Sequence, residues 1–133
     1  MEWPDFRVTV GVNLLDDENL KLCEEFWQAL PFRTIFAASM SAGEMFKVPI
    51  PVIMSEAPPD KLRFFPDEPP GTIFVGPAGS LLLKYGTVVE PFRLPIIGRI
   101  PEPELEKFRG VAIKLTDAYF FTKEINIASL RRK

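Results

Sequence analysis

The segment SAGEMFKVPIP, residues 41–51, holds the carboxylate with the strongest case for a chemical role. In a strand that begins near Gly43, Glu44 shares a face with Phe46 and Val48, whose apolar side chains are expected to face the core. A carboxylate on an apolar face is costly unless it is paired or faces a cavity. Two interpretations stay open: Glu44 is a pocket carboxylate partnered by an arginine, or it is a strand-end residue whose side chain still reaches water.

Arg33 and Arg63 are the candidate partners of Glu44, while Lys84 and Tyr85 close a later strand and could flank the mouth of a site. A lysine at a strand end is commonly just solvated, so a surface role for Lys84 is the alternative. The predicted binding residues, which combine charge with apolar walls, are Glu44, Phe46, Arg33, Arg63, Lys84 and Tyr85.

Composition excludes several kinds of catalytic and metal site. The chain has no histidine, which excludes Ser–His and Cys–His catalysis and histidine-rich metal sites. The single cysteine, Cys23, lies on an apolar helical stripe without a neighbouring base and is expected to be a buried small hydrophobe. The acidic pairs Asp16-Asp17, Glu24-Glu25 and Asp67-Glu68 are adjacent in sequence. Neighbouring residues on a helix do not face each other, so these pairs are typical of surface charge and not of a metal site. We therefore expect no catalytic residue, no metal and no cofactor.

Length and charge set broader limits. A chain of 133 residues, 47% hydrophobic and with twelve phenylalanines, is expected to form a single domain over residues 1–133. The formal charge of −2 gives no global field that favours nucleic acid or an anionic membrane. The basic run Arg131-Arg132-Lys133 is typical of a solvated tail, so nucleic-acid binding is not expected.

The first residues and the amide content bear on location and stability. The segment MEWPDFRVTV is acidic and lacks a long apolar run, so we expect neither a signal peptide nor a membrane span, and the cytoplasm is the default location. Asparagine and glutamine are scarce and prolines number fourteen, a pattern found in heat-tolerant proteins.

The elements that must position these residues are mainly strands. Alternation in DFRVTVGVNL predicts a strand, and the spacing of apolar residues in DDENLKLCEEFWQAL predicts one substantial helix that ends at Pro31. The strands predicted after it are FRTIFAASM, GEMFKVPIPVIM, GTIFVGP, SLLLKYG, LPIIGRI and GVAIKLTDAYFF. PEPELEKF predicts one short helix, and SEAPPDKLRFFPDEPPG a long loop. Many short strands with two helices favour a closed antiparallel barrel.

Four motifs in order resemble a small bacterial and archaeal cyclophilin-like family. They are EEFWQALPF, SAGEMFKVPIPV, PGTIFVGPAGSLLLKYG and LPIIGRI, and the resemblance spans roughly residues 22–115. It implies a cyclophilin-like antiparallel closed β-barrel with one substantial and one short helix. It carries no isomerase catalytic residue onto this chain, because the chain has no histidine and no matching arginine motif.

The leading functional hypothesis is a non-catalytic domain that binds a small polar molecule or an extended peptide in a cleft at the side of the barrel. One alternative is a divergent peptidyl-prolyl isomerase, which would need Arg33 or Arg63 beside Phe46. The other is a homodimer, formed through an edge strand near Pro49 and Pro51 or through the aromatic patch RFF at residues 63–65.

Overall fold

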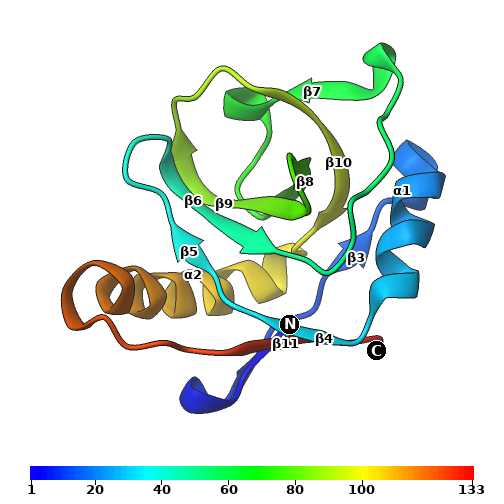
Figure 1. Ribbon diagram of the computed structural model, residues 1–133. Coiled ribbons are helices and arrows are strands. Elements are labelled where there is room, and N and C mark those ends of the chain that lie inside the picture. The colour runs from blue at the N-terminus through cyan, green and yellow to red at the C-terminus, as the bar shows by residue number, and fades with distance from the viewer.

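A curved seven-stranded antiparallel sheet forms the body of the protein in a computed structural model that describes residues 1–133 (Figure 1). Its hydrogen-bonded order is β3-β10-β8-β9-β6-β5, and β7 pairs with β10 off this path. The strands are β3 (Asn13–Leu14), β5 (Ala37–Ala38), β6 (Gly43–Pro49), β7 (Leu62–Phe64), β8 (Thr72–Gly76), β9 (Ser80–Val88) and β10 (Arg93–Arg99).

The predicted closed barrel is wrong. The sheet curls, as Figure 1 shows, but its ladder of hydrogen bonds ends at β3 on one side and at β5 on the other, and these two strands do not pair. Each of them is only two residues long. Such short edges offer too few backbone groups to close the ladder, so the sheet stays open.

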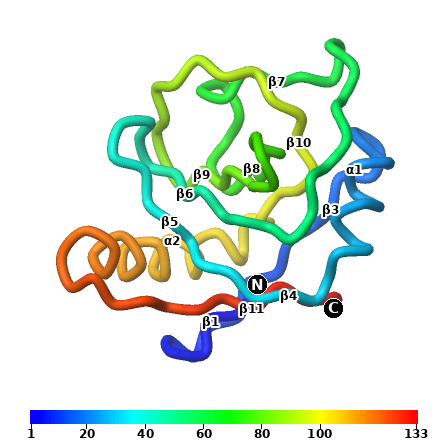
Figure 2. Tube along the Cα trace, viewed as in Figure 1, coloured from blue at the N-terminus to red at the C-terminus, as the bar shows by residue number.

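The two chain ends, together with β4, form a second, four-stranded antiparallel sheet of order β2-β1-β11-β4. Its strands are β1 (Glu2–Trp3), β2 (Val8–Thr9), β4 (Phe32–Thr34) and β11 (Ala128–Leu130). Glu2 pairs with Ser129, so the first and last strands lie side by side (Figure 2). The single strand predicted over DFRVTVGVNL is therefore divided, because β2 belongs to this small sheet and β3 to the large one.

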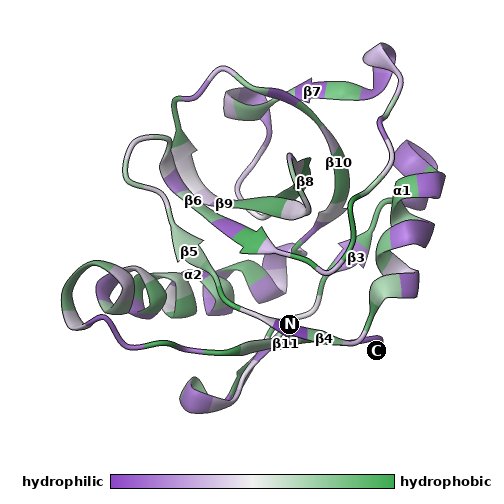
Figure 3. Cartoon of the chain, viewed as in Figure 1, coloured by the Kyte–Doolittle hydropathy of each residue, from purple (hydrophilic) through white to green (hydrophobic).

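The strongest sequence signals for strands in the large sheet are confirmed. The predicted strands GTIFVGP, SLLLKYG and LPIIGRI correspond to β8, β9 and β10, and the predicted strand GEMFKVPIPVIM corresponds to β6 but ends earlier, at Pro49. β8 and β9 form the predicted hairpin, and its turn places Ala78 and Gly79 at positive φ, the conformation that glycine adopts without steric cost. β8, β9 and β10 are rich in apolar residues along their length (Figure 3) because both of their faces are buried.

The long segment between β6 and β8 is not a featureless loop. It contains β7 and two 3₁₀ turns, Pro59–Lys61 and Phe65–Asp67. Phe65 is fully buried and contacts Phe74 edge-on at 4.5 Å between ring centroids. Phe65 is thus an aromatic anchor between the proline-rich segment and the sheet.

Two helices complete the fold, and the second contradicts the prediction. α1 (Asp16–Ala29) agrees with its sequence pattern. α2 (Glu102–Asp117) is sixteen residues long and continues into a π-helical turn, Ala118–Thr122, so the strand predicted over GVAIKLTDAYFF is wrong. The predicted strand began at Gly110, but the buried residues follow helical spacing on both sides of it. They are Leu105, Phe108, Val111, Ala112 and Leu115. Neither helix combines the length and the apolar composition that a membrane-crossing helix needs.

Substitutions at Leu115 and Ile113 test the assignment of this helix. Leu115 is 4% exposed and Ile113 is 64% exposed, although a strand would place both on one face. We expect Leu115→Ala to lower the free energy of unfolding by about 2–5 kcal/mol and Ile113→Ala by less than about 0.5 kcal/mol. Urea unfolding measures both free energies, and an equal loss in the two variants would contradict the helix and support the predicted strand.

Candidate functional site

A cavity of about 580 Å³ lies between the two sheets and the helices. We call it the central cavity. Its wall is made largely of aliphatic and aromatic side chains from both sheets and from α1. These residues are Val10, Val12, Leu14, Phe26, Leu30, Phe36, Val48, Ile73, Leu81, Leu83, Ile97 and Leu130.

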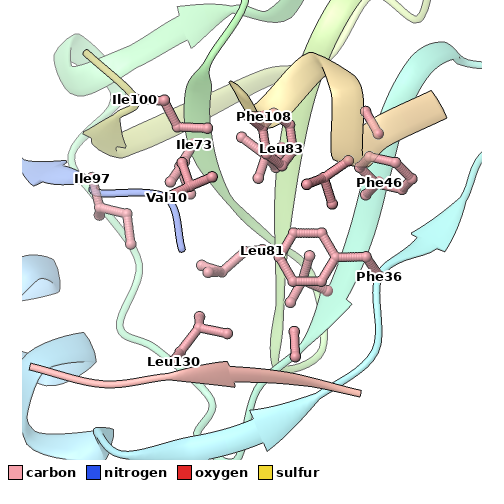
Figure 4. Close-up of a cluster of buried hydrophobic side chains, with 14 of the residues drawn as sticks. Val10, Phe36, Phe46, Ile73, Leu81, Leu83, Ile97, Ile100, Phe108 and Leu130 are labelled. Carbon is pink, nitrogen blue, oxygen red and sulfur yellow. The ribbon is translucent and has the colours of Figure 1, made fainter. Parts of the chain in front are cut away.

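Strand alternation supplies one side of this wall. Ile73, Leu81 and Leu83 point into the central cavity, whereas their neighbours Phe74 and Leu82 belong to a separate apolar cluster on the other face of the sheet. In Figure 4, Leu81 lies among cavity residues contributed by other strands. The hollow is therefore built from residues that simple period-two strands bring to one face.

The small sheet and α1 supply the opposite side. Leu130 comes from β11, Phe36 from the connection between β4 and β5, and Phe26 and Leu30 from the end of α1 (Figure 4 draws the first two). Phe36 is held by an edge-on contact with Trp3, at 5.0 Å between ring centroids. Residues that are far apart in sequence thus meet around a single apolar space.

Charged side chains surround the opening of the central cavity. This rim consists of Glu2, Glu104, Lys107, Arg131, Arg132 and Lys133. Lys107 Nζ donates to the Thr9 carbonyl at 2.9 Å and lies 3.0 Å from Glu104 Oε2, which also accepts the Gly11 N–H at 3.1 Å. The bond from Lys107 and the bond from Gly11 hold the pKa of Glu104 below its usual value, so this carboxylate is charged and engaged.

The last residues of the chain form the remaining part of the rim. Arg131 Nε lies 3.3 Å from Glu2 Oε2. Arg132 donates from Nε and Nη2 to the Trp27 carbonyl, at 3.2 and 2.8 Å, and its guanidinium carbon lies 5.0 Å from the centre of the Trp27 ring. The expected solvated tail is thus tied by side-chain contacts to the end of α1 and to β1.

A second and more polar hollow, of about 530 Å³, contains three of the six predicted site residues. We call it the polar cleft. Glu44, Lys84 and Tyr85 line it, together with Glu68, Gly86, Thr87 and Arg109. A small polar ligand or an extended peptide in this cleft stays a prediction.

Glu44 occupies the strand-end position that was one of its two interpretations. Phe46 and Val48 on its face are buried, but Glu44 is exposed where the register of β6 against β9 shifts between Gly43 and Met45. Its Oε1 accepts the Thr87 N–H at 3.1 Å, and no arginine pairs with it. A Cβ at Gly86 would overlap this carboxylate, which accounts for the glycine there.

Lys84 is buried rather than solvated. The residue is 2% exposed, and its Nζ donates to the carbonyls of Phe65 and Pro66 at 2.9 and 3.3 Å. Burial lowers the pKa of this ammonium group, while the charges of Glu68 and Asp67 oppose that shift. Lys84 therefore ties the turn after β7 to β9, a structural role that its position in the sequence did not reveal.

The other predicted residues do not join this cleft. Phe46 is fully buried, with Tyr85 at 4.8 Å between ring centroids. Arg63 pairs with Glu18 at 2.8 Å, and Arg33 is exposed on β4. The isomerase hypothesis needed one of these arginines beside Phe46, but Arg63 is engaged by Glu18 and Arg33 lies exposed on β4.

The central cavity and its rim were missed in the sequence analysis. The alternation in β8 and β9 indicated which residues point inward, but no pattern in the sequence indicates that the space between layers is left unfilled. No three His, Cys, Asp or Glu side chains gather as they would to hold a metal ion. Chemistry at this site would therefore depend on apolar walls and on the charges of the rim.

Comparison with known proteins establishes the fold. The chain matches no protein-family model and no curated protein sequence. A solved structure of McbB in complex with tryptophan superposes on it with a TM-score of 0.92 at 24% sequence identity. The match covers 99% of this chain and 43% of the McbB chain, so the present chain spans less than half the length of that protein.

The predicted membership in a cyclophilin-like family is therefore wrong. No family model supports it, and a solved structure that shares the fold over nearly the whole chain is that of McbB. The four motifs behind the resemblance coincide with the end of α1, β6, the β8–β9 hairpin and β10. Glycine and proline bound such elements in many antiparallel folds, so these motifs are not specific to one family.

The buried Lys84 gives a prediction for the dependence of stability on pH. Its pKa in the folded protein is lower than the 10.5 of a free lysine side chain, so between these two values the unfolded chain binds more protons. The stability of the wild type relative to Lys84→Met should therefore rise with pH across that window. Urea unfolding from neutral pH to about 10.5 measures it, and parallel profiles for the two proteins would contradict it.

Proposed function

We propose that this chain binds a small, largely apolar molecule, aromatic in character, in the central cavity. The observation that carries the proposal is a cavity of about 580 Å³ with an apolar wall and a charged rim. Ligand sites typically enclose 300–1,000 Å³, are lined by hydrophobic side chains and place a few polar groups at defined positions. The central cavity has all three properties, whereas the polar cleft lacks the apolar wall.

The physical driving force would be the removal of apolar surface from water. An aromatic body the size of an indole ring buries roughly 200 Å² of surface, worth about 5 kcal/mol before the cost of association. Phe26 and Phe36 offer ring faces and edges to such a body, and aromatic pairs add to the gain beyond area. We therefore expect affinities in the micromolar to millimolar range for simple aromatic ligands.

The comparison with solved structures supports an aromatic ligand. McbB, with which this chain shares its fold, was solved in complex with tryptophan. We propose binding without catalysis because the two carboxylates that line the cavity, Glu2 and Glu104, are both held in ion pairs at its rim. Cys23 lies nearby, but burial raises the pKa of its thiol to about 11, and the thiol donates to the Ile97 carbonyl.

Leu81→Phe tests the proposal by filling the cavity. The added ring would occupy space that the ligand needs, so we expect at least a tenfold loss of affinity for indole, with stability unchanged or raised by up to about 1 kcal/mol. Isothermal titration calorimetry and urea unfolding give the two quantities.

Leu82→Phe is the matched control, because Leu82 is adjacent in β9 but faces the packed cluster around Phe74. Extra volume there should cost about 1–3 kcal/mol of stability and leave indole affinity unchanged. Wild-type protein that fails to bind indole or tryptophan at concentrations near 1 mM would refute the proposed function.

A further inference from the structure

We infer that the ligand of the central cavity carries a carboxylate next to its apolar body, and that Arg131 and Arg132 are the residues that select it. This inference rests on the proposed function and adds to it the chemical class of the ligand. It is drawn from the rim, where cationic side chains outnumber acidic ones and retain free hydrogen-bond donors.

The acids of the rim are already engaged. Glu104 accepts bonds from Lys107 and from the Gly11 amide, and Glu2 is paired with Arg131. Four cationic side chains (Lys107, Arg131, Arg132 and Lys133) stand against these two carboxylates. The side chains of the rim therefore present a net positive charge to whatever enters the cavity.

Arg132 is held in a defined orientation. Two of its N–H groups bind the Trp27 carbonyl, and its guanidinium group lies over the Trp27 ring. A guanidinium group has five N–H donors, so three remain without a protein partner. No carboxylate lies within ion-pair distance of Arg132. A planar fork fixed at the cavity edge with free donors is suited to bind a carboxylate by two parallel bonds.

Arg131 adds a second guanidinium group to the rim, on the side of β1. Only its Nε is engaged, by Glu2, so its terminal nitrogens keep their donors. Because the wall next to the rim is apolar, a charge pair at this edge is less screened than one on an open surface. A neutral ligand would leave these donors to water, and a cationic ligand would be repelled.

Three indole compounds of similar size test the inference: indole-3-acetate, indole-3-acetamide and tryptamine, which differ in the charge of one terminal group. By calorimetry on the whole chain at low salt, we expect indole-3-acetate to bind at least tenfold more tightly than the amide, and tryptamine to bind most weakly. The preference for acetate should fall as salt is added.

Arg131→Gln and Arg132→Gln should each reduce the preference for indole-3-acetate over indole-3-acetamide by threefold or more, while affinity for indole-3-acetamide changes little. Arg93→Gln is the matched control, because Arg93 also places its guanidinium group over an aromatic ring, Phe64 at 4.9 Å, but lies away from the cavity. Thermal unfolding of each variant verifies folding, and Arg131 is the less disruptive position because its pair with Glu2 is exposed.

The failures of the two proposals are distinguishable. If indole-3-acetate and indole-3-acetamide bind equally, or if tryptamine binds best, the inference of a carboxylate is overturned and the proposed function stands. If both arginine variants keep the full preference for acetate, the assignment to Arg131 and Arg132 is overturned. If none of the three compounds binds, the proposed function itself fails and the inference fails with it.

Discussion

Burial of β8, β9 and β10 on both faces is the constraint on which the rest of the structure depends. A strand with two apolar faces must be covered by two layers. On one face the turn after β7 supplies Phe65, which packs on Phe74. On the other face the chain ends, α1 and α2 form the cover, and the central cavity lies between this cover and the sheet.

The sequence indicated local structure well where the apolar residues of a segment followed only one period, either that of a helix or that of a strand. α1 and the β8–β9 hairpin were predicted because their apolar spacing and turn residues leave a single interpretation. α2 was missed because Val111, Ile113 and Leu115 also alternate, and only the burial of Phe108 and Ala112 shows that the helical period governs. The division of residues 6–15 between two sheets was missed because it depends on tertiary pairing: β2 pairs with β1, whereas β3 pairs with β10 far along the chain.

The candidate site illustrates the same limit at the level of single residues. Glu44 was predicted on the face of Phe46 and Val48, and it is exposed at the start of β6, where the register against β9 shifts. Lys84 seemed an ordinary strand-end lysine and is buried, because the fold brings the carbonyls of Phe65 and Pro66 to its ammonium group. Periodicity assigns a side chain to a face, and only tertiary packing decides whether that face meets solvent, protein or empty space.

The pairing of β1 with β11 has a practical consequence for work with this protein. Both chain ends reach the same edge of the fold, and both contribute side chains to the mouth of the cavity. An affinity tag, a fusion partner or a longer natural polypeptide attached at either end would therefore start at the entrance itself. A circular permutant that joins the two ends and opens the chain in the turn at Pro77–Gly79 would move such attachments away from it.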